Sequence, residues 1–192
     1  MEPKERLWIS RERDGRAQAA SKPLLMVDID GVISLFGVAG AISGETPAAD
    51  GCFHSIDGIP HFLSATAAAH LLALSALFDL VWASGWEEKA NEHLPHLLEL
   101  PVLPFLRFDA GTRGTRETQG HWKLASIDAY AAGRPLAWID DALGPACHRW
   151  AAERTAPTLL VQTAPELGLT SREALLLEGW AAQRSAAGSP AG

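Results

Sequence analysis

Cysteine is scarce in this chain, which contains only Cys52 and Cys147 among 192 residues. Two cysteines cannot form a disulfide framework, and neither stands in the Cys-x-x-Cys pattern of a zinc site. Long apolar runs are also missing: the longest, residues 65–78, is interrupted by His70 and is shorter than the roughly 20 residues that a membrane span needs. The first 22 residues contain no apolar segment of a secretory signal. We therefore expect a reducing, cytoplasmic setting and no membrane partner.

Positive charge is in short supply, because 16 Lys and Arg stand against 23 Asp and Glu and give a formal net charge of −7. This balance disfavours nucleic-acid binding through bulk charge, although it leaves room for a local basic groove. The hydrophobic fraction of 47% and the charged fraction of 20% are those of a folded globular chain rather than a disordered one. At this length we expect one domain with a full hydrophobic core.

Short continuous apolar runs alternate with helical patterns through the middle of the chain. Such alternation predicts an α/β fold in which helices cover both faces of a mainly parallel, five-stranded sheet. The predicted strands are 24–27, 80–83, 105–108, 136–139 and 158–162, and the predicted helices are 64–78, 87–100, 120–132, 145–154 and one that opens at a capping box over 170–173.

Residues 33–63 interrupt this alternation with scattered glycines and prolines. Within them, Asp57-Gly58 stands between two isoleucines, which is typical of a hairpin turn, so we predict a small β-flap beside the first strand. The domain is predicted to span residues 22–183 and to include this flap. Residues 1–21 and 184–192 are interpreted as flexible tails because they lack hydrophobic periodicity.

Polar side chains follow four of the predicted strands. In a parallel sheet, ligands bind outside the carboxyl ends of the strands, so these residues are the candidates for a functional site. Two carboxylates two positions apart in an extended chain point to the same side, and this places the first pair in one crevice. The candidates are Asp28, Asp30, Ser84, Gly85, Trp86, Lys123, Asp140 and Asp141.

Together, these residue types are suited to binding a metal ion and transferring a phosphoryl group. Crowded carboxylates repel one another unless a cation lies among them, and oxygen ligands without His or Cys favour a hard ion, with Mg²⁺ as the best candidate. A carboxylate can attack phosphorus and form an aspartyl-phosphate, while a second carboxyl group moves the proton. An ammonium group, a hydroxyl and helix-start N–H groups are the partners that phosphoryl oxygens need.

Four segments, LLMVDIDGV, LVWASGW, HWK and LAWIDD, resemble in this order the four motifs of the haloacid dehalogenase (HAD) superfamily, over about residues 23–180. The strings WASGWEEKAN, RPLAWIDD and GLT further resemble a small bacterial HAD group related to the HAD domain found beside RNA-repair enzymes. The resemblance implies a Rossmannoid three-layer sandwich of HAD type with a minimal cap.

The resemblance also implies a role for each motif residue. Asp28 is implied to be the nucleophile and a metal ligand. Asp30 is implied to be the general acid and base, and its backbone carbonyl oxygen to be a further metal ligand. Because dehalogenases and phosphonatases of the superfamily lack the second acid, Asp30 implies phosphate-ester hydrolysis or phosphoryl transfer.

The remaining motif residues are implied to bind the substrate and the Mg²⁺ ion. Ser84 hydrogen-bonds the phosphoryl oxygens, and Lys123 neutralises the nucleophile and the phosphoryl group. Asp140 completes the metal site, and Asp141 holds a metal-bound water or supports the lysine. The substrate-binding set is Ser84, Gly85, Trp86 and Lys123, and the metal-binding set is Asp28, Asp30, Asp140 and Asp141.

The predicted function is therefore a Mg²⁺-dependent phosphatase that hydrolyses a phosphomonoester through an aspartyl-phosphate. Two alternatives stay open: a non-catalytic HAD-like binding or regulatory module, and a nucleic-acid-end phosphatase linked to RNA repair. Three arginines, Arg107, Arg113 and Arg116, make residues 107–120 either an anion-binding patch or a solvated loop. The class of the phosphorylated substrate and the oligomeric state are left open.

Overall fold

Four parallel strands form the central sheet of the molecule. The computed structural model describes residues 22–37, 50–108 and 122–187. Within them the sheet has the order β5 (Asp79–Trp82), β1 (Leu24–Val27), β6 (Leu136–Asp140) and β7 (Thr158–Gln162). The continuous apolar runs of β1 and β6 are fully buried, as expected for inner strands covered on both faces.

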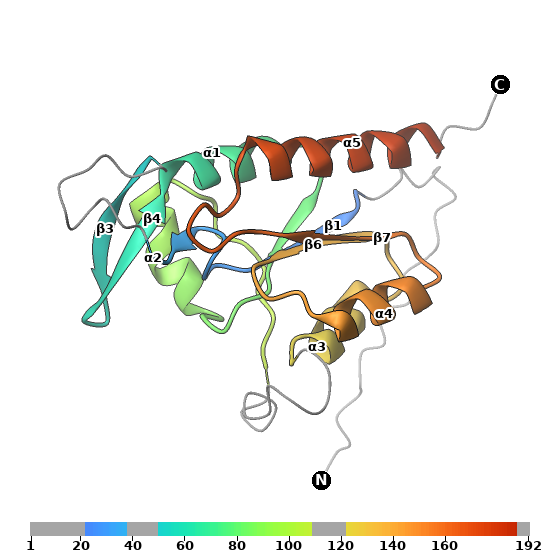
Figure 1. Cartoon of the computed structure of the whole chain (residues 1–192), viewed down its shortest axis with the longest axis horizontal. Helices are drawn as coiled ribbons and strands as arrows, with labels where there is room; N and C mark the ends of the chain where they lie inside the picture. Colours follow the sequence, from blue (N-terminus) through green and yellow to red (C-terminus); the bar gives the residue numbers. More distant parts are fainter. Residues whose placement is uncertain (1–21, 38–49, 109–121, 188–192) are drawn as a thin grey trace, which may run out of the picture.

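Helices cover both faces of this sheet (Figure 1). One layer holds α1 (Ala65–Leu74) and α5 (Ser171–Ala187), and the other holds α3 (Leu124–Ala131) and α4 (Pro145–Glu153). Successive residues of β1 pack into opposite layers: Leu25 lies in the core cluster under α1 and α5, whereas Met26 lies in the cluster above α3 and α4. The predicted three-layer α/β architecture is confirmed.

The prediction of a fifth strand over residues 105–108 is wrong. Phe105 forms only an isolated parallel bridge with Trp82, flanked by hydrogen bonds from Leu106 N to Trp82 O and from Trp82 N to Pro104 O. Prolines at positions 101 and 104 carry no N–H group, so this segment cannot extend a ladder along the edge of β5. Residues 105–108 are thus apolar enough for a strand, but the prolines before them lack the N–H donors that a longer ladder needs.

The flap is an antiparallel sheet of β2 (Ser34–Leu35), β4 (Ile59–Ser64) and β3 (Gly51–Ile56), in that order. Its hairpin turns at Asp57 and Gly58, whose φ angles of 51° and 79° are those of a two-residue turn with both residues left-handed. The predicted small β-flap is confirmed for the described part of residues 33–63, since residues 38–49 lie outside it.

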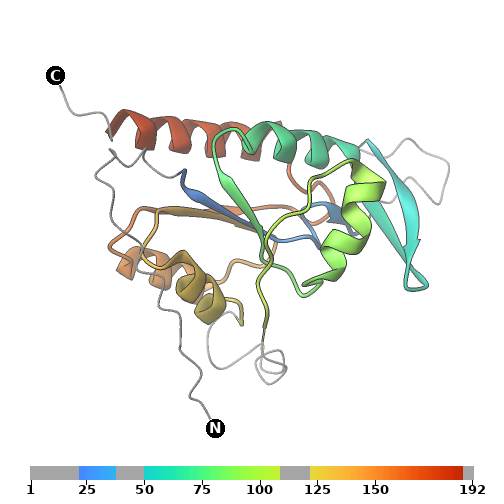
Figure 2. The same cartoon turned by 180° about the vertical axis from the view of Figure 1, so that it is seen from behind.

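The flap runs directly into α1, and α2 (Lys89–Leu98) lies beside it (Figure 2). Ser64 ends β4 and caps α1, because its hydroxyl oxygen accepts a hydrogen bond from Ala67 N at 3.1 Å. An ion pair joins Lys89, at the start of α2, to Asp57 in the hairpin turn. The flap is therefore tied to the domain at its base and at its tip.

The last helix begins at the predicted capping box. Thr170 N donates to the carboxylate of Glu173, and Thr170 O accepts from Ala174 N. The helix then runs to Ala187, past the position at which the sequence suggests that a tail begins; the predicted N-terminal tail over residues 1–21 lies outside the described residues. None of the helices in the described ranges is long and apolar enough to cross a membrane.

Candidate active site

The candidate residues meet because the parallel strands end in register. Val27 lies opposite Trp82 on one side and Ile139 on the other. Backbone hydrogen bonds continue past these positions, from Asp28 N to Ile139 O at 3.0 Å and from Ala83 N to Val27 O at 2.8 Å. The residues that follow β1, β5 and β6 therefore share one rim of the sheet.

Lys123 joins two of these strand ends. Its Nζ lies 2.6 Å from Asp28 Oδ2 and 2.7 Å from Asp140 Oδ2, and its side chain is only 3% exposed. The lysine immediately precedes α3, one of the two helices that cover one face of the sheet. A basic group and two acids that are far apart in the sequence thus form one buried cluster.

Three carboxylates form a cluster of metal-ligand type. Oxygen atoms of Asp28, Asp140 and Asp141 all lie within 4.8 Å of one another. Asp140 is fixed in this cluster by hydrogen bonds that it accepts from Trp138 Nε1 at 3.2 Å and Ala142 N at 2.9 Å. Carboxylates without His or Cys form a donor set that suits a hard divalent cation, so the residues present fit Mg²⁺.

The electrostatics of the cluster favour a cation. Burial raises the pKa of Asp28 to about 7, against the opposing charge of Lys123. Burial by itself would lower the pKa of Lys123, but the negative charges of Asp28 and Asp140 outweigh it and raise that pKa. Burial and the neighbouring Asp140 also raise the pKa of Asp141. One ammonium group is thus shared by several acids, and a bound cation would stabilise their charged forms.

Asp30 lies apart from this acidic cluster. Its Oδ2 accepts a hydrogen bond from Trp86 Nε1 at 3.0 Å. Its Oδ1 is buried and has no hydrogen-bond partner among the described residues. The indole ring of Trp86 also meets the ring of His61 in the flap, edge to face, with centroids 4.9 Å apart. The structure therefore links the second acid to the flap through Trp86.

The segment after β5 completes the rim. Ser84 is buried, and its carbonyl oxygen accepts from Glu87 N in the turn that leads to α2. Gly85 is exposed, and a Cβ atom built there would lie 3.7 Å from the ring of Trp122, next to Lys123. The proposed phosphate-binding residues thus occupy this rim, and their individual roles stay predictions.

Of the three arginines in the predicted anion patch, only Arg107 lies within the described residues. Its guanidinium pairs with Glu88 at 2.7 Å and lies over the ring of Phe105, 5.2 Å from the centroid. Arg113, Arg116 and the neighbouring His121 lie outside the described residues. These contacts do not test anion binding, so the choice between an anion-binding patch and a solvated loop stays open for residues 107–120.

Sequence reasoning missed two residues that support the rim. Thr163 is buried, and its hydroxyl donates to Gly31 O at 2.8 Å while its backbone N–H donates to Asp140 O at 3.2 Å. It directly follows β7, so the rule that selected polar residues after strands would have found it. His61 comes from the flap, and no pattern in the sequence indicates its contact with Trp86.

The family of the chain follows from a comparison with known protein families. A profile described as "HAD domain in Swiss Army Knife RNA repair proteins" matches residues 24–174. The chain belongs to this family. The matched range begins at the first residue of β1 and ends in the first turn of α5, so this HAD domain includes the whole central sheet and the flap. A search of curated proteins finds no match.

Membership of the HAD family indicates a hydrolase of phosphatase type. HAD enzymes typically use Mg²⁺, and the acidic triad of Asp28, Asp140 and Asp141 agrees with a metal site of that kind. The predicted resemblance to the superfamily, and to the group associated with RNA repair, is thereby confirmed.

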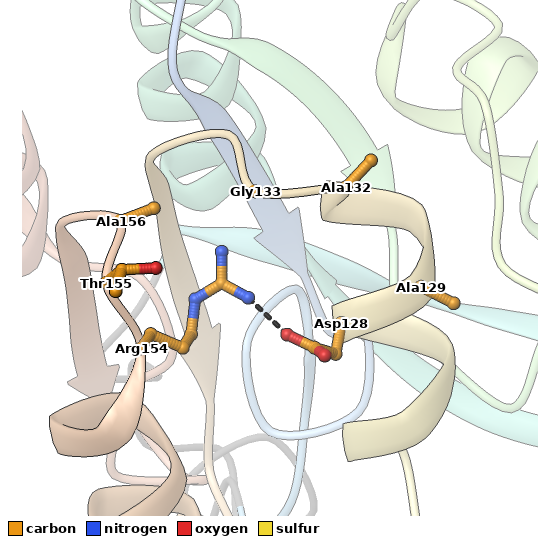
Figure 3. Close-up of a pocket in the computed structure, with 7 residues that line it drawn as sticks. All are labelled: Asp128, Ala129, Ala132, Gly133, Arg154, Thr155 and Ala156. Atoms are coloured by element: carbon orange, nitrogen blue, oxygen red, sulfur yellow. Dashed lines mark hydrogen bonds and ion pairs between the residues drawn. The ribbon is translucent and has the colours of Figure 1, made fainter.

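A separate cavity of about 370 Å³ lies between the end of α3 and the connection from α4 to β7 (Figure 3). The strands β6 and β7 begin there, so the cavity lies at the N-terminal ends of the strands, whereas the acidic rim lies at their C-terminal ends. Arg154 in its wall pairs with Asp128 and donates to Thr158 Oγ1 and Arg134 O. These contacts give Arg154 a structural role in joining the two helices to the sheet.

Proposed function

We propose that this HAD domain is a Mg²⁺-dependent phosphatase that hydrolyses a phosphomonoester through an aspartyl-phosphate. The observation that carries the proposal is the double contact of Lys123 Nζ with Asp28 and Asp140 at the edge of a three-carboxylate cluster. A nucleophilic carboxylate, a fixed positive charge and a metal-ligand set then lie within one small volume, which is what transfer of a phosphoryl group requires.

In the first step, the carboxylate of Asp28 attacks phosphorus, and the bond from phosphorus to the leaving oxygen breaks. Asp30 donates a proton to that oxygen, so the product leaves as an alcohol. Lys123 and Ser84 bind the phosphoryl oxygens. Mg²⁺, held by the carboxylates of the cluster with the backbone carbonyl of Asp30, would supply further positive charge to those oxygens.

In the second step, Asp30 removes a proton from water, and the water oxygen attacks the phosphorus atom of the phosphoaspartate. The bond between phosphorus and Asp28 breaks, inorganic phosphate leaves, and both carboxyl groups return to their starting states. The low exposure of Asp28 and Lys123 limits access of other water molecules to this position.

A phosphorylated nucleic-acid end is the second candidate for the substrate class. The description of the matched family, which places such domains in RNA repair proteins, favours it. The formal net charge of −7 argues against bulk attraction to nucleic acid, and a smaller phosphomonoester requires no such attraction. We propose to separate the two by comparing 5′- and 3′-phosphorylated oligonucleotides with nucleotides and sugar phosphates at equal concentration.

The activity itself is tested with p-nitrophenyl phosphate, in the presence of Mg²⁺ or of EDTA. We expect hydrolysis only with Mg²⁺, and the Asp28→Asn variant should lose on the order of 10⁴-fold in kcat because an amide cannot form the phosphoenzyme. Acid-quenched wild-type protein should carry a phosphoryl group that hydroxylamine releases.

Two results would contradict the proposal. Equal activity in Asp28→Asn would remove the covalent mechanism. A folded wild-type protein that hydrolyses none of the phosphate esters would instead favour a non-catalytic binding or regulatory module.

A further inference from the structure

We propose that Trp86, which the family resemblance places among the substrate-binding residues, instead orients the carboxyl group of Asp30 for proton transfer. In this role it is a positioning residue and is supported by His61 of the flap. The inference rests on the proposed phosphatase function, in which Asp30 serves the leaving oxygen and the attacking water. On this inference, the flap contributes to catalysis indirectly, because its contact with Trp86 helps to hold Asp30 in place.

Trp86 Nε1 donates a hydrogen bond to Asp30 Oδ2 at 3.0 Å. An indole N–H group only donates, so it binds the Asp30 oxygen that acts as an acceptor. The second oxygen, Oδ1, is buried and has no hydrogen-bond partner among the described residues. Trp86 therefore restrains the rotation of the carboxyl group and leaves one defined oxygen without a partner among the described residues.

The flap supports the indole ring of Trp86 through His61. The ring of His61 meets Trp86 at a centroid distance of 4.9 Å and an interplanar angle of 72°, which is an edge-to-face contact. His61 is itself held, because its Nδ1 lies 2.9 Å from Ser34 Oγ in the neighbouring strand β2. His61 therefore connects the flap to the indole ring of Trp86 and restrains where that ring lies.

Together these contacts form a closed ring that begins and ends at Asp30. Ser34 is buried, its carbonyl oxygen accepts from Gly31 N at 2.7 Å, and it forms a bridge with Asp30. The path therefore leaves Asp30 through its side chain to Trp86, passes through His61 to Ser34, and returns to the backbone of Asp30. Such a ring restrains the carboxyl group and the main chain that carries it at the same time.

The matching experiment replaces Trp86 by phenylalanine, which keeps an aromatic ring against His61 and removes the N–H donor. We expect kcat/KM for an alkyl phosphate, which reports formation of the phosphoenzyme, to fall about tenfold, because an alkoxide leaving group needs the proton from Asp30. For 2,4-dinitrophenyl phosphate, kcat/KM should change by less than about twofold, since that phenolate leaves without a proton and the later attack of water does not enter kcat/KM. The Asp30→Asn variant should show the same selectivity in kcat/KM with a larger loss.

Two comparisons isolate the positioning role. Added to Asp30→Asn, the Trp86→Phe substitution should cost nothing further, because the group that it positions is already absent. The control is Trp180→Phe in α5, whose ring stacks on Phe78 away from the rim; it should leave the rates for both esters unchanged. His61→Ala should reproduce part of the Trp86→Phe pattern, and His61→Phe less of it.

A measurement without substrate tests the same contact. The indole N–H resonance of Trp86, assigned by its disappearance in Trp86→Phe, should be protected from exchange in the wild-type protein. In Asp30→Ala it should shift and exchange faster, because the acceptor oxygen has been removed. An unchanged resonance in Asp30→Ala would overturn the inference.

The kinetic outcomes distinguish this inference from the function on which it rests. If wild type is active and Asp30→Asn discriminates between leaving groups, an equal loss in Trp86→Phe for both esters with a raised KM would show that the ring binds substrate instead. Unchanged kinetics in Trp86→Phe would also overturn the inference. An active Asp28→Asn variant would overturn the proposed function, and the inference with it.

Discussion

Lys123 places one positive charge between the carboxylates of Asp28, which follows β1, and Asp140, which ends β6. Its Nζ contacts Asp28 and Asp140 within 2.7 Å, and all three side chains are almost completely buried. Buried charges are costly unless they are paired, so each member of this group depends on the others for its solvation. The residue proposed to bind the phosphoryl group thus also stabilises the folded state.

We expect Lys123→Met to lower the free energy of unfolding by about 3–5 kcal/mol in EDTA, because two buried carboxylates lose the positive charge between them. Urea denaturation followed by circular dichroism measures this change. The matched control is Lys89→Met, which removes an exposed ion pair with Asp57 and should have little effect. A Lys123→Met protein as stable as the control would contradict the buried contacts described above.

Single residues differ in how far the sequence predicts them. Asp28 and Asp140 could be placed together because parallel strands end at one rim, and Thr163 satisfies the same rule. Within the described residues, Lys123 precedes α3 and follows no strand, so the prediction of its place at the rim depends on its resemblance to a family motif. The hydrogen bond from Trp86 to Asp30 could not be predicted, since it depends on side-chain rotamers. The contact of His61 with Trp86 could not be predicted either, because it depends on how the flap folds back on the rim.

At the scale of elements, the turn after β1 is shaped around the acidic cluster. Gly31 has a φ of +73°, and a Cβ atom built on it would lie 2.6 Å from the side chain of Asp141. The carbonyl oxygen of the same residue accepts the hydrogen bond from Thr163. The turn therefore needs a glycine for its backbone conformation and also for the space that it leaves to the acid.

Gly31→Ala should lower both stability and Mg²⁺ affinity, because it strains the backbone and displaces Asp141. The control is Gly133→Ala: its φ of +80° imposes a similar strain of about 1–2 kcal/mol, but its Cβ would meet nothing within 4 Å. Urea unfolding and titration calorimetry with Mg²⁺ would measure the two effects. The same loss of stability in both variants, with unchanged Mg²⁺ affinity, would refute the steric argument.

Most helices and strands could be predicted from the sequence. The physical reasons for this also explain why the predicted strand over residues 105–108 is wrong. β1 occupies the residues of its apolar run, and the flap turns at Asp57-Gly58, because burial and left-handed turn conformations leave direct traces in the sequence. Residues 105–108 have the apolar pattern of a strand but follow Pro104, and hydrogen-bonding capacity rather than hydrophobicity decides their state. The hydrophobic pattern by itself does not distinguish a strand from an apolar segment that lacks N–H donors.

At the scale of the whole molecule, the sheet order β5-β1-β6-β7 gathers the acidic cluster from segments more than 100 residues apart. The sequence predicts a parallel α/β sheet but not this order, because neighbouring strands are chosen by long-range packing. A ligand that binds only the assembled rim must stabilise the entire domain against unfolding.

Mg²⁺ should therefore raise the free energy of unfolding by about 2.7 kcal/mol at a concentration of about 100 times its Kd. Thermal denaturation in Mg²⁺ and in EDTA measures the shift of the midpoint. Asp141→Asn should reduce that shift, because it removes one carboxylate charge from the cluster while keeping a similar shape. A midpoint that does not respond to Mg²⁺ in the wild type would count against the metal site.

The hydrogen bond between Thr163 and Gly31 spans 132 positions of the chain. During synthesis, the strand that carries Asp28 emerges from the ribosome early, whereas Lys123, Asp140 and β7 follow much later. A nascent chain therefore presents Asp28, the proposed nucleophile, before the residues proposed to activate it. On this topology, the complete rim forms only after the last strand of the sheet has been translated.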